Sequence, residues 1–139
     1  MLLDAEKREL STLRINHARQ CLSDAEVMRE TESYKSAANR IYYAVFHAMR
    51  AVLILDGFDS KKHSGIISEF QRLYIKTGIF AKETSTVISS AFDIRTNSDY
   101  NDFYIVSKAD VDEQLESARS FVELVSAYLD SVFTPNDAQ

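Results

Sequence analysis

The sequence feature that most constrains the fold is a long apolar stretch from Ser36 to Gly57, which reads SAANRIYYAVFHAMRAVLILDG. A helix that is apolar on nearly every side packs in the middle of a bundle. Arg40 and His47 nevertheless lie inside the stretch, and their spacing of seven residues places them on one helix face, about 10 Å apart along the axis. Because a buried, unpaired charge costs several kcal/mol, we expect Arg40 to have a partner elsewhere in the fold.

Residue content and periodicity both favour an all-α fold. The 139 residues include three glycines and one proline, which is fewer than strand-and-turn architectures need. Apolar residues recur at spacings of three and four, a pattern typical of amphipathic helices. We expect an up-and-down bundle of four to five helices that forms one domain over residues 1–133, with a frayed tail at 134–139. The predicted helices cover residues 4–29, 34–56, 63–77, 84–96 and 108–132.

The segments around these helices carry weaker local signals. The polar face of the first helix, which includes Arg14, is typical of a solvated surface. Ser33 is placed to cap the second helix, and Ser64 is placed in a capping box that would open the third. Residues 97–102, NSDYND, are rich in turn formers and predict the end of the fourth helix. The apolar segment 103–106 that follows is expected to pack onto the bundle.

Charge and cysteine content restrict the classes of function and partner. A net charge of −5 argues against a broad nucleic-acid footprint, but it leaves room for a small, locally basic RNA site. The single cysteine, Cys21, cannot form an intramolecular disulfide, so it predicts core packing in a reducing compartment. Charged residues follow Leu3 at once, and no apolar run reaches the length of a membrane span. We therefore expect a soluble cytoplasmic protein with no membrane contact.

Metal and cofactor chemistry are not expected. One cysteine and three separated histidines show no metal-ligand spacing, so a zinc site is not predicted. Three glycines cannot build a phosphate-cradling loop, and no serine nucleophile motif is present.

Two polar clusters within apolar helices remain as candidates for a site. One is Arg40 with His47, and the other is the run RTNSDY from Arg95 to Tyr100. In one interpretation these cations form a buried, hydrogen-bonded network in which Asp99 neutralises an arginine and nearby tyrosines satisfy the remaining donors. In the other they mark a functional site, because hydrophobic replacements would often be as stable.

The residues in these clusters resemble a known family. The run AANRIYYAVFHA at residues 37–48 is similar to the second helix of HEPN-domain proteins, in particular the small stand-alone kind, which reads A-x-x-R-x-Y-Y-A-x-F-H-A. The resemblance continues through KHSG at residues 62–65, Phe70, FDIR at residues 92–95 and the pair DY at residues 99–100. It implies a helical bundle that pairs into a homodimer.

The resemblance also implies an activity that this sequence matches only in part. Many HEPN proteins are metal-independent ribonuclease toxins in which an arginine holds the scissile phosphate and a histidine, four to six residues later, moves a proton. Arg95 matches that arginine and Thr96 the polar position after it, whereas Tyr100, Asn101 and Asp102 occupy the places where the histidine is expected.

Two histidines elsewhere in the chain are candidates for the site: one could replace the missing catalytic histidine, and the other could contribute to binding. His47 is the candidate catalytic replacement, on the condition that the second and fourth helices pack so that it faces Arg95. The candidate binding residues around this pair are Arg40, Thr96, Asp99, Tyr100 and His63, the last of which could instead begin the third helix without any role in binding.

HEPN proteins of this kind often act beside a minimal nucleotidyltransferase, which in some cases attaches AMP to a tyrosine just past the arginine motif. Tyr104, and less clearly Tyr100, matches that position, although a packing role is the plainer interpretation.

Three functional hypotheses therefore remain open. The first is the HEPN half of a nucleotidyltransferase toxin–antitoxin pair that binds nucleotide, RNA or its partner at a polar site around Arg95 and Arg40. The second is an active ribonuclease toxin with an altered arginine–histidine motif, and the third is a purely structural helical adaptor.

Overall fold

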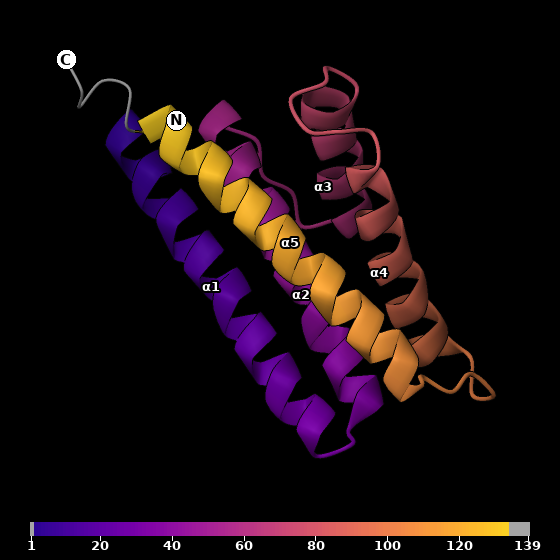
Figure 1. The fold of residues 1–139 in the computed structure, drawn as a ribbon. Coiled ribbons are helices and arrows are strands. Elements are labelled where there is room, and N and C mark those ends of the chain that lie inside the picture. Colours follow the sequence, from indigo (N-terminus) through magenta and orange to yellow (C-terminus); the bar gives the residue numbers. More distant parts are fainter. Residues whose placement is uncertain (1, 134–139) are drawn as a thin grey trace.

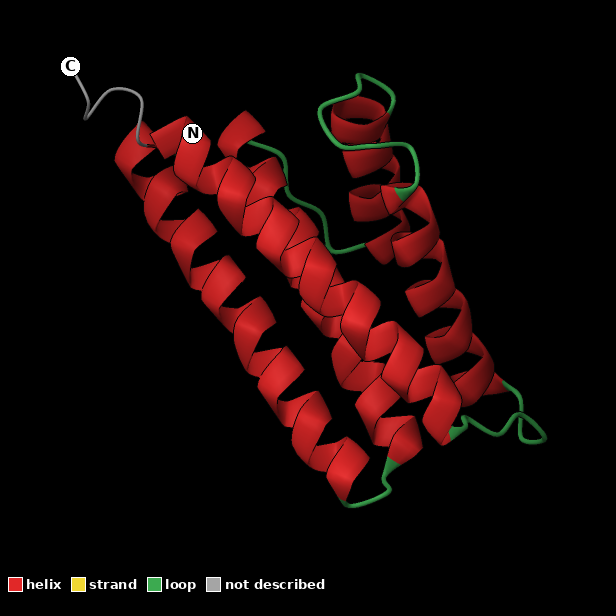
Figure 2. Cartoon of the chain, viewed as in Figure 1, coloured by secondary structure: helices red, strands yellow, loops and turns green. Residues whose placement is uncertain are grey.

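The computed structural model describes residues 2–133 and shows an all-α bundle, as the sequence predicts. Within these residues there is no strand (Figure 2). The five helices are α1 (Asp4–Glu30), α2 (Tyr34–Leu53), α3 (His63–Phe70), α4 (Thr84–Tyr100) and α5 (Lys108–Phe133). A 3₁₀ turn, η1 (Ile54–Asp56), follows α2, and a π-helical segment, η2 (Gln71–Ile75), follows α3.

The second helix is the centre of the bundle. It packs against α1, α3, α4 and α5, and α1 and α4 lie on different sides of the α2–α5 pair (Figure 1). Its small residues allow close approach, since Ala37, Ala44, Ala48 and Ala51 are completely buried. The prediction of a central, all-round apolar helix is therefore confirmed, and side chains on different faces of α2 meet different neighbours.

The end of the fourth helix differs from the predicted one, because side-chain contacts extend the helix through residues that usually form turns. The fourth helix continues to Tyr100, although its last residues are turn formers. An ion pair between Arg95 and Asp99, one turn apart, supports this final turn, and Asn101 N–H donates to the Asn97 carbonyl. At the end of η1 the chain turns through Gly57 in the left-handed region, at φ 76°.

Two capping predictions and one packing prediction need correction. Ser33 precedes α2 without a side-chain capping bond, and α3 begins after Lys62 rather than in a capping box made by Ser64. In the segment 103–106, Phe103 and Ile105 are 94% and 84% exposed, while Val106 is buried and Tyr104 is half-buried. Two of the four side chains therefore pack on the bundle, and the other two are exposed.

The predicted frayed tail, 134–139, lies outside the described residues. Among residues 2–133, no helix is both long enough and apolar enough to cross a membrane.

Candidate functional site

The guanidinium groups of Arg40 and Arg95 meet at one aromatic ring. The Cζ atom of Arg40, on α2, lies 5.2 Å from the centroid of the Tyr43 ring, and the Cζ atom of Arg95, on α4, lies 5.7 Å from it. Arg95 also lies 5.1 Å from the ring of Tyr42. These cation–π contacts hold both charges without using their N–H donors.

The polar contacts of these two arginines are few, and the one that reaches another helix joins Nη1 of Arg40 to the Cys21 sulfur, at 4.0 Å. Arg40 donates from Nε and Nη2 to the side-chain oxygen of Asn39, at 3.3 and 2.9 Å. Arg95 Nε lies 3.0 Å from a carboxylate oxygen of Asp99, an ion pair without the alignment of a hydrogen bond. Asp99 therefore pairs with an arginine, as the network interpretation expects, while Arg40 is connected to Arg95 through the shared Tyr43 ring. A guanidinium has five N–H donors, so both groups retain donors for a ligand.

His63 is an imidazole on which the charge of Arg95 acts. Its Nδ1 is 2.9 Å from the hydroxyl oxygen of Tyr42, and its ring centroid is 4.2 Å from that of Phe46. Burial, and then the charges of Arg95 and Arg50, lower the pKa of His63. Burial also raises the pKa of Tyr42 to about 12, against the opposing charge of Arg95, so this tyrosine stays protonated.

The ring contacts of His47 are with α1 and with its own helix, and Arg95 is not among the charges that act on it. Its ring stacks on that of His17 on α1, with centroids 4.0 Å apart. Burial lowers the pKa of His47 to about 4, helped by the charges of His17, Arg50, Arg40 and Arg14. Position 47 of α2 points toward α1, whereas positions 42 and 43 carry the rings that Arg95 of α4 contacts.

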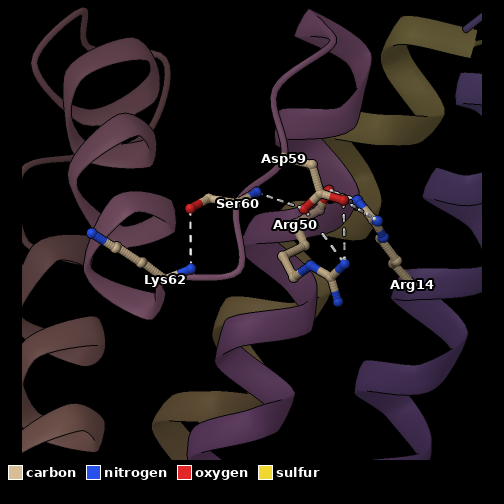
Figure 3. Close-up of polar contacts among 5 residues, drawn as sticks. All are labelled: Arg14, Arg50, Asp59, Ser60 and Lys62. Carbon is tan, nitrogen blue, oxygen red and sulfur yellow. Dashed lines mark hydrogen bonds and ion pairs between the residues drawn. The ribbon is translucent and has the colours of Figure 1, made fainter.

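A second pair of arginines meets at a carboxylate (Figure 3). Arg14 of α1 approaches Asp59 with Nη2 2.9 Å from an oxygen, and Arg50 of α2 lies 3.5 Å from both oxygens. The Ser60 N–H donates to the same carboxylate, and the Ser60 hydroxyl accepts from the Lys62 N–H. Burial acts to raise the pKa of Asp59, but Arg14, Ser60 and Arg50 together hold it below its usual value.

An open depression is lined by Arg50 and Asp59 of the second pair and by Tyr43, the ring that Arg40 and Arg95 contact. Its walls carry four aromatic or imidazole rings, two cations and one carboxylate, contributed by Tyr43, Phe46, His47, His63, Arg50, Lys61 and Asp59. Cationic side chains bind phosphate oxygens, and ring faces stack with nucleobases. The surface is therefore chemically suited to a nucleotide or to single-stranded RNA.

The remaining predicted residues lie around or beyond this region. Thr96 is half-buried, next to Arg95, and Tyr100 is 79% exposed at the end of α4. Tyr104 lines a separate depression, together with Ser98 and residues of the α1–α2 turn. Burial, with a contribution from Asp110, raises the pKa of Tyr104.

Sequence reasoning missed two features of this region. It assigned Arg14 to a solvated face, and no pattern marked Asp59 as a partner, because the position of Asp59 depends on the course of the loop after Gly57. It also found no metal-ligand spacing among the histidines and the cysteine, although three of these four residues lie together in space. His17, Cys21 and His47 place one potential ligand atom each within 4.8 Å of one another.

Comparison with known proteins gives a consistent result. The HEPN domain family matches residues 11–128. A UPF0332 protein of Thermotoga maritima is 31% identical over 127 residues, which cover 91% of this chain and 96% of that protein. Two proteins of Methanocaldococcus jannaschii, named "Putative toxin MJ0142" and "Putative toxin MJ0605", are 32% and 31% identical over 88% and 71% of this chain, and over 83% and 74% of their own length.

Proposed function

This chain belongs to the HEPN family, and on that basis we propose that it is the toxin-like half of a pair with a minimal nucleotidyltransferase and binds RNA through Arg40, Tyr43 and Arg95. The observation that carries the RNA-binding part is the contact of two guanidinium groups, from different helices, with the single ring of Tyr43. The names of the two Methanocaldococcus relatives support the toxin-like part.

The chemistry of the cluster favours RNA as the ligand. Arginine pairs with phosphate through charge-assisted hydrogen bonds, and aromatic rings stack with unpaired bases. Asp99 and Asn39 occupy some of the donors of Arg95 and Arg40, and the others stay available. Because the net charge of the chain is −5, such binding would depend on this local cluster rather than on the whole surface.

Fluorescence anisotropy with a labelled single-stranded RNA at low salt tests this proposal. We expect Arg95→Gln and Arg40→Gln each to weaken binding about tenfold or more, because a hydrogen bond to a charged group contributes roughly 1.5–3 kcal/mol. Arg72→Gln is the matched control, since it removes the same charge from an exposed arginine that pairs with Glu69. Unchanged binding in Arg95→Gln, or an equal loss in Arg72→Gln, would contradict the proposal.

A second candidate function is metal-independent RNA cleavage, and one observation favours it. His63 is hydrogen-bonded to Tyr42 within the field of Arg95, so an imidazole and a guanidinium act on the same region although the expected histidine after Arg95 is missing. In this mechanism Arg95 would hold the scissile phosphate, and His63, rather than His47, would move a proton.

The cleavage assay uses RNA in buffer containing EDTA, with product analysis on a gel. We expect cleavage to be lost in both Arg95→Gln and His63→Gln while far-ultraviolet circular dichroism stays unchanged, and to persist in Arg72→Gln. If the unmodified chain binds RNA but does not cleave it, the cleavage hypothesis is wrong and only the binding function remains.

The pairing with a nucleotidyltransferase and the homodimer are tested separately. Co-expression with a nucleotidyltransferase encoded beside this chain should give a complex that copurifies, and light scattering should show two copies of the isolated chain.

Modification by the partner is measured by mass spectrometry. If the partner transfers AMP, the intact mass of this chain should rise by one AMP group, and Tyr104→Phe should abolish that increase while Tyr100→Phe retains it. Modification that persists in Tyr104→Phe would exclude Tyr104 as the acceptor.

A further inference from the structure

Two histidines and the cysteine converge where α1 packs against α2. His17 and Cys21 are four residues apart on α1, so they lie on one face of that helix. His47 meets them from α2, and one potential ligand atom of each residue lies within 4.8 Å of the other two. The rings of His17 and His47 are stacked, inclined by 19°, so their in-plane nitrogen lone pairs run side by side, and the exposed His17 ring must turn to share an ion with His47.

The donors and their environment suit a borderline-soft metal ion. Thiolate and imidazole are the preferred zinc ligands, with Zn–S of about 2.3 Å and Zn–N of about 2.0 Å, which puts two nitrogens and one sulfur of a tetrahedral site roughly 3.3–3.6 Å apart. Closure by roughly 1.2–1.5 Å would reach that geometry, and His17 can supply it because its side chain is exposed. Nδ1 of His47 is buried and makes no hydrogen bond with the described residues.

Some of the charges around these donors oppose the binding of a cation, and others favour it. Arg14, Arg40 and Arg50 surround His47 and oppose a cation. Two contacts reduce that opposition: Asp59 pairs with Arg14 and Arg50, and Nη1 of Arg40 lies 4.0 Å from the Cys21 sulfur. Burial raises the pKa of the Cys21 thiol, and the charge of Arg40 opposes that rise, so the metal itself must displace the thiol proton. The thiolate then supplies a negative charge directly to the metal.

We infer that His17, Cys21 and His47 form a three-ligand zinc site between α1 and α2, with a fourth position open to water. Exposed His17 provides a route by which the ion can enter. Three protein ligands with an open position are typical of non-structural zinc sites, so the fold does not depend on the metal. This inference goes beyond RNA binding and does not depend on it.

Titration of the untagged, reduced full-length protein with Co²⁺, a spectroscopic substitute for zinc, tests the site. We expect one equivalent to give a thiolate-to-cobalt charge-transfer band and intensified visible bands, both removed by Zn²⁺. Cys21→Ala should abolish the charge-transfer band. His17→Gln should weaken Zn²⁺ binding at least tenfold, since loss of outer-shell partners alone costs roughly 10–100-fold.

His63→Gln is the matched control, because it removes the one histidine outside the cluster and should leave the cobalt spectrum unchanged. His17→Gln changes an exposed side chain, so it stays folded and keeps the test decisive even if Cys21→Ala does not. In addition, Zn²⁺ should raise the melting temperature of the unmodified chain and of His63→Gln, but not that of His17→Gln. Absence of a charge-transfer band, or Zn²⁺ affinity unchanged in His17→Gln, would overturn the inference.

Discussion

Two pairs of arginines link neighbouring helices in this protein, and they differ in what lies between the charges. Arg14 and Arg50 meet at the carboxylate of Asp59, whereas Arg40 and Arg95 meet at the ring of Tyr43. A carboxylate neutralises part of the charge that it contacts. An aromatic ring holds a cation in place and leaves both its charge and most of its donors available.

One arginine of each pair is buried to a similar extent, so the difference between these two side chains comes from the groups that they contact. The side chains of Arg50 and Arg95 are 25% and 20% exposed, yet Arg50 helps to anchor the loop at Asp59 and Arg95 faces the rings of α2. Each pair also has a contact of the other kind, since Arg50 lies 5.8 Å from the Phe46 ring and Arg95 pairs with Asp99. We expect loss of the shared carboxylate to act mainly on stability and loss of the shared ring to act mainly on RNA binding.

Tyr43→Ala gives the largest expected effect. It removes the ring that both guanidiniums contact, and base–aromatic stacking alone contributes roughly 1–3 kcal/mol per base. We therefore expect RNA affinity, measured by anisotropy, to fall by more than tenfold. Tyr43→Phe keeps the ring face and should bind nearly as well as the unmodified chain. An equal loss in Tyr43→Phe would show that the hydroxyl, and not the ring, is what matters.

Asp59→Asn gives an intermediate effect, on stability. It leaves Arg14 and Arg50 facing each other without a carboxylate, and we expect the free energy of unfolding in urea to fall by about 1 kcal/mol, since the pair is partly exposed to solvent. Asp99→Asn is the comparison, because a single helical i,i+4 ion pair contributes roughly 0.3–0.5 kcal/mol. If Asp99→Asn costs as much as Asp59→Asn, the distinction between the two pairs fails.

The smallest expected effect is a pH dependence that belongs to His63. The groups that act on its ring are Tyr42 and Arg50 from α2 and Arg95 from α4. Because the folded-state pKa of His63 is lowered, the unfolded chain takes up the proton more readily below about pH 6.5, and stability falls as the pH drops through that range. Urea unfolding between pH 8 and 5, with EDTA present, should show a shallower decline in His63→Gln. An identical decline in both proteins would contradict this.

Much of the fold could be predicted from the sequence because its helices carry unambiguous signals. The apolar surface of residues 34–53 required neighbours on several sides, and α2 has them. The end of α4 could not be predicted from local propensity, since Asp99 is a turn former in isolation but an ion-pair partner for Arg95 one turn earlier. Ser64 failed as a cap because the course of the preceding loop starts α3 after Lys62.

The candidate site was less accessible to sequence reasoning, since it depends on which helix each face meets. The positions of Arg40 and Arg95 among apolar residues indicated that they were unusual, but the periodicity of α2 alone could not show that His47 faces α1. The four-residue spacing of His17 and Cys21 was a readable signal of a shared helix face. Its meaning required the position of His47, which only the packing of α1 on α2 supplies.

The hydrogen bond between Tyr42 and His63 links the tautomer of the imidazole to the direction of the bond, because either atom can be the donor. Burial keeps the phenol of Tyr42 protonated, and a neutral imidazole that accepts this proton at Nδ1 carries its own proton on Nε2. In that tautomer the ring can give a proton to a departing oxygen or donate to a phosphate, but it has no free lone pair with which to begin an attack. In the other tautomer Nδ1–H donates to the phenol oxygen and Nε2 carries the free lone pair of a base, so the tautomer of His63 would decide its role in a strand-cleaving reaction at this surface.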